Sequence, residues 1–175
     1  MKAYLGIDVG GKGFITLCKP DGEYEFFSIE AHTPREIDDF LKGVKSNYQQ
    51  LFCAMEEIHA IFGSAAKATF SFGEINGLLK GLLIANSIPF ELVQPKKWQD
   101  EIWGFSDKVF ETKVVKTKDG SFKQQKRINT KQTSFNAAAR LFPSIDLRKS
   151  QRSKNLDDNK CDSLLICEYA RRKNL

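Results

Sequence analysis

Three short apolar segments joined by two tight turns open the chain, and they limit the folds available to it. The segments are residues 3–9, 13–18 and 24–29. Each has the length and apolar content of a strand, with Gly10-Gly11 in the first turn and Pro20-Asp21-Gly22 in the second. Turns this short join neighbouring antiparallel strands, so the pattern predicts an antiparallel meander at the start of the fold.

The rest of the chain alternates between helical and strand patterns. Thr33 and Glu36 form a capping box with Pro34 at the first helical position, which predicts a helix start. Later patterns predict strands at 51–58 and 89–93, and helices at 73–85, 130–141 and 158–171. We therefore expect one α/β domain over residues 1–175, with a mixed five-stranded sheet flanked by helices.

Positive charge is concentrated in one part of the chain. Residues 113–154 hold twelve Lys and Arg against Asp119 and Asp146, a balance of +10; since the whole chain carries +5, the remainder carries −5. A basic block beside an acidic remainder favours a polyanionic partner, with nucleic acid first. Residues 103–129 form a basic insert without a clear period, which fits either a protruding hairpin or a mobile, solvated loop.

The spacing of the cysteines and the lengths of the apolar segments indicate the cellular compartment in which the protein works. Cys18, Cys53, Cys161 and Cys167 have no Cys-x-x-Cys spacing and lie in apolar contexts, so we expect buried, reduced thiols rather than disulfides or zinc ligands. No stretch approaches the roughly 18 apolar residues of a membrane span. The strand pattern starts almost at Met1, which leaves no room for a signal peptide. We expect a cytoplasmic protein with no membrane partner.

Carboxylates end three distant segments of the chain. Asp8 ends the first strand, and Glu56 and Glu57 end the strand predicted at 51–58. Asp158 and Asp162 lie one turn apart on the last helix, where like charges repel unless a cation lies between them. Each acid also has a plain structural explanation, as a turn residue, the start of a loop or a helix N-terminal acid. Their common place at element ends favours a shared site.

Strand geometry shows how these acids could meet. If the strands at 3–9 and 51–58 are parallel neighbours, a glutamate arrives beside Asp8, because open α/β sheets bind ligands beyond the carboxyl ends of their strands. Alternation lets only one of Glu56 and Glu57 point into such a site. Oxygen ligands without His or Cys suit Mg²⁺ or Mn²⁺, and two such ions about 4 Å apart can hydrolyse a phosphodiester.

Several of these segments are matched by one known family. The matching pieces are Tyr4 to Gly10, Ala54 to Ala60, Pro95 to Gln99, Ala139 to Pro143 and Asp158 to Ala170. Together they resemble the RuvC-type Holliday-junction resolvases of the ribonuclease H-like superfamily, most closely the phage and poxvirus branch. The match spans nearly the whole chain except about 103–129. Its specificity comes from the order and spacing of the pieces rather than from any single motif.

The resemblance implies a ribonuclease H-like fold and a homodimeric, Mg²⁺-dependent endonuclease that nicks two opposed strands of a four-way DNA junction. It assigns Asp8, Glu56 and Asp162 as catalytic metal ligands for two ions, with Mn²⁺ as a substitute. Many members have an acid or His three residues before the last Asp, where this chain has Asn159. We therefore take Asp158 as the fourth ligand. Glu57 remains an alternative to Glu56, and Asn159 and Asp157 remain alternatives to Asp158.

The resemblance also assigns residues 59–83 to a dimer and junction-wedge region. Phe62, Phe70 and Phe72 are its candidates for stacking on unpaired bases, with core packing as the alternative. We expect the following cations to contact DNA phosphates: Lys96, Lys97, Lys113, Lys116, Lys118, Lys123, Lys126, Arg127, Lys131, Arg148, Lys149, Arg152 and Lys154.

Three other functions compete with junction resolution. Asp8-Val9-Gly10-Gly11 also resembles the first phosphate loop of actin-like and sugar-kinase ATPases, but 175 residues cannot hold their duplicated domain. A ribonuclease H-like module that only binds nucleic acid would be expected to have lost its acids. A broader nuclease acting on flaps, other branched DNA or RNA–DNA hybrids would keep them.

Overall fold

The structure is a computed structural model, and it describes residues 1–58, 66–117 and 120–174. The chain forms two compact units. The first comprises Met1–Ile102 and Asn159–Leu175, and the second comprises Trp103–Asp158. The second unit contains the insert expected at 103–129 and continues beyond it.

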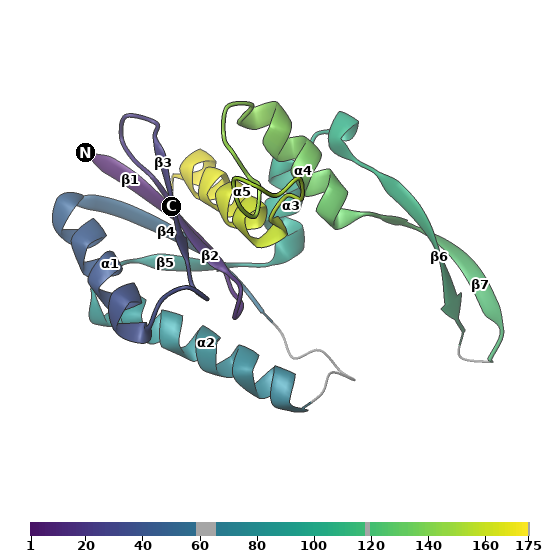
Figure 1. Cartoon of the computed structure of the whole chain (residues 1–175), viewed down its shortest axis with the longest axis horizontal. Helices are drawn as coiled ribbons and strands as arrows, with labels where there is room; N and C mark the ends of the chain where they lie inside the picture. Colours follow the sequence, from purple (N-terminus) through teal and green to yellow (C-terminus); the bar gives the residue numbers. More distant parts are fainter. Residues whose placement is uncertain (59–65, 118–119, 175) are drawn as a thin grey trace. The chain divides into compact units, whose positions relative to one another are not determined.

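A five-stranded sheet is the centre of the first unit (Figure 1). Its strands are β1 (Lys2–Asp8), β2 (Phe14–Cys18), β3 (Tyr24–Ser28), β4 (Gln50–Glu56) and β5 (Phe90–Val93). They lie in the order β3-β2-β1-β4-β5. The first three form the predicted antiparallel meander, while β4 pairs in parallel with both β1 and β5. The mixed five-stranded sheet is therefore confirmed.

Among the described residues of the first unit, four helices accompany this sheet. They are α1 (Pro34–Asn47), α2 (Ala66–Ala85), α3 (Pro95–Ile102) and α5 (Asp158–Lys173). The capping box at Thr33 forms as predicted. Helix α2 is longer than the predicted 73–85, and α3 forms where no helix was predicted. Residue Pro95 starts α3 with its fixed φ, and burial of Trp98 and Ile102 holds this short helix in place.

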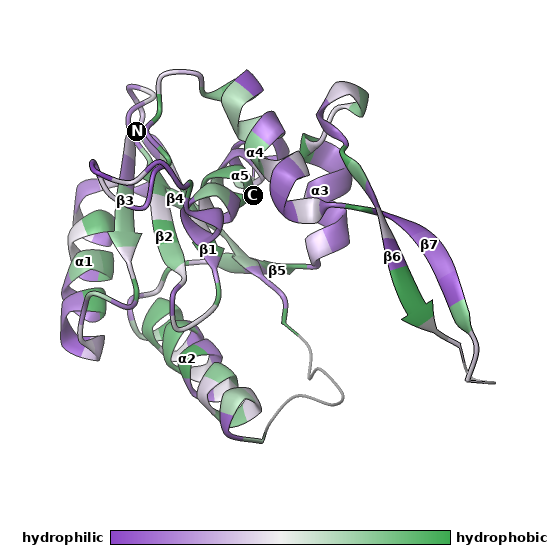
Figure 2. Cartoon of the chain, turned by 45° about the vertical axis from the view of Figure 1, so that its right-hand side comes forward, coloured by the Kyte–Doolittle hydropathy of each residue, from purple (hydrophilic) through white to green (hydrophobic). Residues whose placement is uncertain are grey.

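The main apolar core lies on one face of the sheet. Side chains such as Leu5, Ile7 and Met55 project from β1 and β4 and pack in one cluster with Leu41 of α1 and Leu79 of α2. Alternation along the strands sends the intervening residues to the opposite face. Figure 2 shows apolar residues along these strands and over much of α2.

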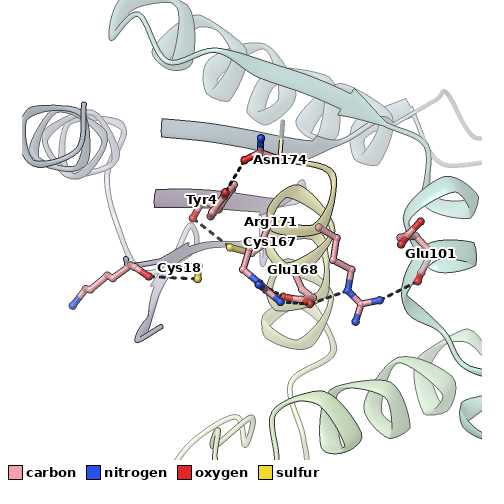
Figure 3. A network of polar contacts seen from close by, with 9 residues as sticks. Tyr4, Cys18, Glu101, Cys167, Glu168, Arg171 and Asn174 are labelled. Carbon is pink, nitrogen blue, oxygen red and sulfur yellow. Dashed lines mark hydrogen bonds and ion pairs between the residues drawn. The ribbon is translucent and has the colours of Figure 1, made fainter. Parts of the chain in front are cut away.

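Helix α5 packs against that opposite face, and a glycine makes this possible. A Cβ atom on Gly6 would lie 2.2 Å from the backbone nitrogen of Cys167 and 2.4 Å from the carbonyl oxygen of Ser163. The Cys167 thiol donates to the Tyr4 carbonyl at 3.3 Å, and the Tyr4 hydroxyl donates to Asn174 Oδ1 at 3.0 Å (Figure 3). The end of α5 thus lies near the start of β1, so α5 runs antiparallel to β1.

The second unit is built from a hairpin and a helix. Its elements are a 3₁₀ turn η1 (Phe105–Asp107), β6 (Phe110–Lys116), β7 (Phe122–Ile128) and α4 (Thr130–Leu141). Strands β6 and β7 pair along their full length as an antiparallel ribbon. Of the two forms expected for the basic insert, the hairpin is the one that forms.

The four cysteines are all buried, and none forms a disulfide. Burial raises the pKa of the Cys53 and Cys167 thiols, which keeps both protonated. The expectation that the four thiols are buried is confirmed. Within the described part of the chain, no helix has both the length and the apolar character needed to cross a membrane.

Candidate catalytic site and nucleic-acid contacts

Asp8 and Glu56 end two neighbouring parallel strands at the same level. The register pairs Ile7 with Met55, so the next residue on each strand is the acid. Parallel strands lie about 4.8 Å apart, and partners at one level point to the same face. Both acids therefore belong to the face that carries Gly6 and packs against α5. Asp8 is buried, with 8% of its surface exposed.

A tryptophan of α3 holds Glu56. The indole nitrogen of Trp98 donates to Glu56 Oε1 at 3.0 Å, and Trp98 itself is fully buried. Burial raises the pKa of the Glu56 carboxyl, and the Trp98 hydrogen bond opposes this only in part. By strand alternation the neighbouring Glu57 belongs to the other face, and its N–H donates to the Val93 carbonyl at 2.8 Å. Sequence reasoning found Glu56 but not Trp98.

Asp162 lies early in α5, directly before Ser163, whose carbonyl oxygen lies against Gly6 of β1. It is eleven residues before Lys173, which places the two within about 20° of each other around the helix. Lys173 forms an ion pair with Glu101 of α3. Helical side chains lean toward the helix N-terminus, which for α5 is the direction in which β1 ends. Asp162 therefore lies toward the strand ends that carry Asp8 and Glu56.

The fourth proposed metal ligand is harder to assign than the sequence suggested. Ser163 packs on Gly6, and Asn159 lies within about 40° of Ser163 around α5, whereas Asp158 lies about 140° away. Asp158 instead pairs with Lys131 at 2.8 Å. Although burial alone would raise the pKa of Asp158, this lysine lowers it overall. By helical phase, Asn159 is the residue on the sheet side, and sequence reasoning set it aside because it carries no charge.

The three acids of the first unit suit a hard cation by their chemistry. Asp8, Glu56 and Asp162 come from β1, β4 and α5, and all supply carboxylate oxygens, the donors preferred by Mg²⁺ and Mn²⁺. Among the described residues, no group of three or more His, Cys, Asp or Glu side chains lies close enough together to hold a metal ion. Like-charged carboxylates repel one another without a cation, so binding would require them to turn inward.

The expected wedge phenylalanines fall into three classes. Phe62 lies outside the described residues. Phe70 on α2 is 68% exposed, so it is available to a ligand. Phe72 is half-buried, with its ring 3.4 Å from the position of a Cβ on Gly10, just beyond the end of β1. Phe70 thus fits an external contact, whereas Phe72 lies against the β1–β2 turn.

The expected DNA-binding cations are largely exposed, but several already have anionic partners. Lys97 pairs with Glu91, Lys113 with Glu111, and Arg148 with Asp146. The cations without such a pair among the described residues are Lys96, Lys123, Lys126, Arg127, Lys149, Arg152 and Lys154. Lys118 and the side chain of Lys116 lie outside the described part.

Comparison with solved structures identifies the fold of this chain. No family model matches the chain, and no curated protein matches it either. A structure of Thermus thermophilus RuvC in complex with a Holliday junction substrate is similar over 99% of this chain and 96% of that one, with 10% identity and a TM-score of 0.53. Another Thermus thermophilus RuvC structure is similar over 98% and 96%, with 13% identity and a TM-score of 0.50. The chain therefore has a RuvC-like, ribonuclease H-like fold.

Proposed function

We propose that this protein is a divalent-metal-dependent endonuclease that resolves four-way DNA junctions by paired nicks. The observation that supports the proposal is that Asp8 and Glu56 end the paired parallel strands β1 and β4 at one level, on the sheet face against which α5, the helix that carries Asp162, packs at Gly6. The likeness to RuvC supports it through the fold, and the exposed cations support a DNA substrate.

The chemistry follows from what these residues can do. Asp8, Glu56 and Asp162 would hold Mg²⁺ or Mn²⁺, with Asp158 as the proposed fourth ligand and Asn159 as its rival. When bound, two such ions activate a water molecule and stabilise the leaving oxygen of a phosphodiester. The Trp98 hydrogen bond fixes the orientation of one Glu56 oxygen and leaves the other for a cation. A cation beside Glu56 also favours its deprotonated form.

Paired nicks need two active sites, and α2 offers a face for a second copy. Gly73, Gly77 and Gly81 recur every four residues on its exposed side, and a Cβ on any of them would meet nothing within 4 Å. Phe70 and Ile84 are exposed on the same helix, at 68% and 67%. Small residues let two helix backbones approach closely, and the flanking apolar side chains would be buried. We therefore propose a homodimer formed through α2.

A cleavage assay on a synthetic four-way junction tests the function, with linear duplex, flap and RNA–DNA hybrid substrates in parallel. We expect symmetric nicks in the junction with Mg²⁺ and none with chelator. Asp162→Asn should abolish cleavage and leave junction binding intact, because it removes a ligand without adding charge. Cleavage of every substrate at the same rate would contradict junction selectivity. Junction binding without any cleavage by the wild type would favour the non-catalytic module.

The fourth ligand can be assigned separately. If Asp158 holds a metal ion, Asp158→Asn should lower cleavage far more than Asp157→Asn does. If the fourth ligand is instead the residue on the sheet side of α5, Asn159→Ala should lower the cleavage rate strongly and Asp158→Asn should lower it little. Cleavage rates of these three variants at saturating Mg²⁺ distinguish the two arrangements.

A further inference from the structure

The β6–β7 ribbon has two chemically different faces. Paired residues of an antiparallel ribbon share a face, and the pairs alternate between faces along the strands. The first face, here called the aromatic face, carries Phe110, Thr112, Val114, Phe122, Gln124, Lys126 and Ile128. The second, the basic face, carries Glu111, Lys113, Val115, Lys123, Gln125 and Arg127.

The apolar side chains of the aromatic face are unusually exposed to solvent. Phe110, Val114 and Phe122 are 50%, 65% and 73% exposed. The ammonium group of Lys126 lies 4.6 Å from the centre of the Phe110 ring, so this ring already serves as a surface for a cation. Exposed apolar side chains gathered on one face indicate a binding surface.

The charge of the ribbon selects among the possible partners. Lys123, Lys126 and Arg127 have no carboxylate partner among the described residues, and the single acid, Glu111, is engaged by Lys113 and Asn129. A second copy of the ribbon would bring like charges together, which is unfavourable. A polyanion is the complementary partner.

The aromatic rings decide what kind of polyanion fits. In duplex DNA the bases are stacked on one another and offer no free ring face, so a duplex would meet only the cations and leave the phenylalanines in water. Unpaired bases do offer free faces, and each base–aromatic stack contributes about 1–3 kcal/mol. We propose that the β6–β7 ribbon binds an unpaired nucleic-acid strand, with bases on the aromatic face and phosphates at Lys126 of the same face, while Lys123 and Arg127 of the basic face add positive charge to the ribbon.

The dimensions of the ribbon agree with a short strand. Phe110 and Phe122 lie at opposite ends of the aromatic face, since Phe122 pairs with the sixth residue after Phe110. At about 3.3 Å per residue the two rings are roughly 20 Å apart, with Val114 between them. Such a length suits a few consecutive unpaired nucleotides. This inference rests on the proposed function, because a branched junction supplies such a strand where its base pairs open.

Binding of a fluorescent oligothymidylate strand, measured by anisotropy in chelator with the full chain, tests the inference. The double variant Phe110→Ala/Phe122→Ala should bind the strand at least about tenfold more weakly, and a duplex of equal length about equally well. Val115→Ala is the matched control, because it truncates an apolar side chain on the basic face of the same ribbon. Lys126→Ala, which removes the cation of the aromatic face, should instead reduce the salt dependence of strand binding, by about 0.7 in log–log slope.

A second variant keeps the test valid if the double variant folds poorly. Phe122→Trp retains a stacking ring, and its fluorescence should be quenched by the strand but not by the duplex. Trp98 and Trp103 are buried, so the new indole dominates this change. Unchanged strand affinity in the double variant would overturn the inference, as would an equal loss on duplex. Conversion of a dimer to a monomer by the double variant would also overturn it, because the aromatic face would then join two copies.

The failure of this inference can be told from failure of the proposed function. A wild-type chain that binds the strand through the ribbon but cuts no junction contradicts the nuclease and leaves the inference standing. A wild-type chain that cuts junctions, with a double variant that binds and cuts equally well, contradicts the inference alone.

Discussion

Individual acidic residues in this chain are distinguished by the side of the element on which they lie. Glu56 and Glu57 are adjacent and chemically alike, but Glu56 shares a face with Asp8 and accepts from Trp98. Strand alternation predicts this difference from the sequence alone. The Trp98 contact joins residues 42 positions apart and has no local signature, so the sequence could not predict it.

The two glutamates give a direct test of the site. Glu56→Gln should reduce Mg²⁺-dependent junction cleavage by about a hundredfold or more, because a neutral amide is a weaker ligand than a carboxylate. Glu57→Gln, the matched control, should cleave nearly as well as the wild type. Single-turnover cleavage rates measure both. The reverse order would place the active face on the other side of β4.

An ion pair between the buried Asp107 and the partly exposed Arg140 of the second unit makes a pH-dependent prediction. Asp107 accepts from Arg140 at 3.0 and 2.6 Å and from the Gly104 N–H at 2.7 Å. The Arg140 hydrogen bonds lower the pKa of Asp107 below its ordinary value of 3.8, against the opposing effect of burial. The pair therefore stabilises the folded state above pH 3.8, and this contribution is lost as the pH falls through the lowered pKa.

Asp107→Asn should lower the free energy of unfolding by about 2 kcal/mol at neutral pH, since it leaves a guanidinium without its anion. The difference from the wild type should shrink at pH 3. Urea unfolding at the two pH values measures it. Asp146→Asn is the control, because its pair with Arg148 is exposed and such pairs contribute little. An equal effect of both substitutions would contradict the role assigned to burial.

At the scale of elements, prediction from sequence succeeded where the signal was local. The capping box at Thr33 fixed the start of α1, and alternation with short turns predicted the meander. Helix α3 was missed because its stability comes from burying Trp98 and Ile102, which only the assembled fold provides. The choice between Asp158 and Asn159 likewise depends on which side of α5 meets the sheet, and the sequence pattern leaves that open.

The contact between β1 and α5 depends on Gly6. Gly6→Ala would force a Cβ to within 2.6 Å of three α5 backbone atoms, and backbone cannot move aside as a flexible side chain does. We expect the free energy of unfolding to fall by about 3 kcal/mol, at the upper end of overpacking costs. Gly11→Ala should be nearly neutral, because nothing lies within 4 Å of a Cβ there. Urea denaturation compares the two, and a stable Gly6→Ala variant would contradict this packing.

For the whole molecule, the main question is how one small chain would make the two coordinated cuts of the proposed function. The described part of a single chain offers one candidate set of acids, so under this proposal a second set would come from a second copy. The exposed glycine face of α2 is the surface proposed for that contact. Within the isolated chain these glycines carry a cost, since glycine in a helix is less favourable than alanine by about 0.5–1 kcal/mol. Close packing of a partner helix would offset it.

Gly77→Leu tests this dimer directly. Because a Cβ at Gly77 meets nothing within 4 Å, the single chain should fold as well as before or slightly better. Across a dimer interface the new side chain would hold the two helices apart, so the mass measured by light scattering should fall from dimer to monomer. Paired nicking of the junction should fall with it. Gly43→Leu is the matched control, since Gly43 lies in α1 with equally open surroundings and should leave mass and cleavage unchanged. A Gly77→Leu variant that remains dimeric would place the contact between copies on another surface.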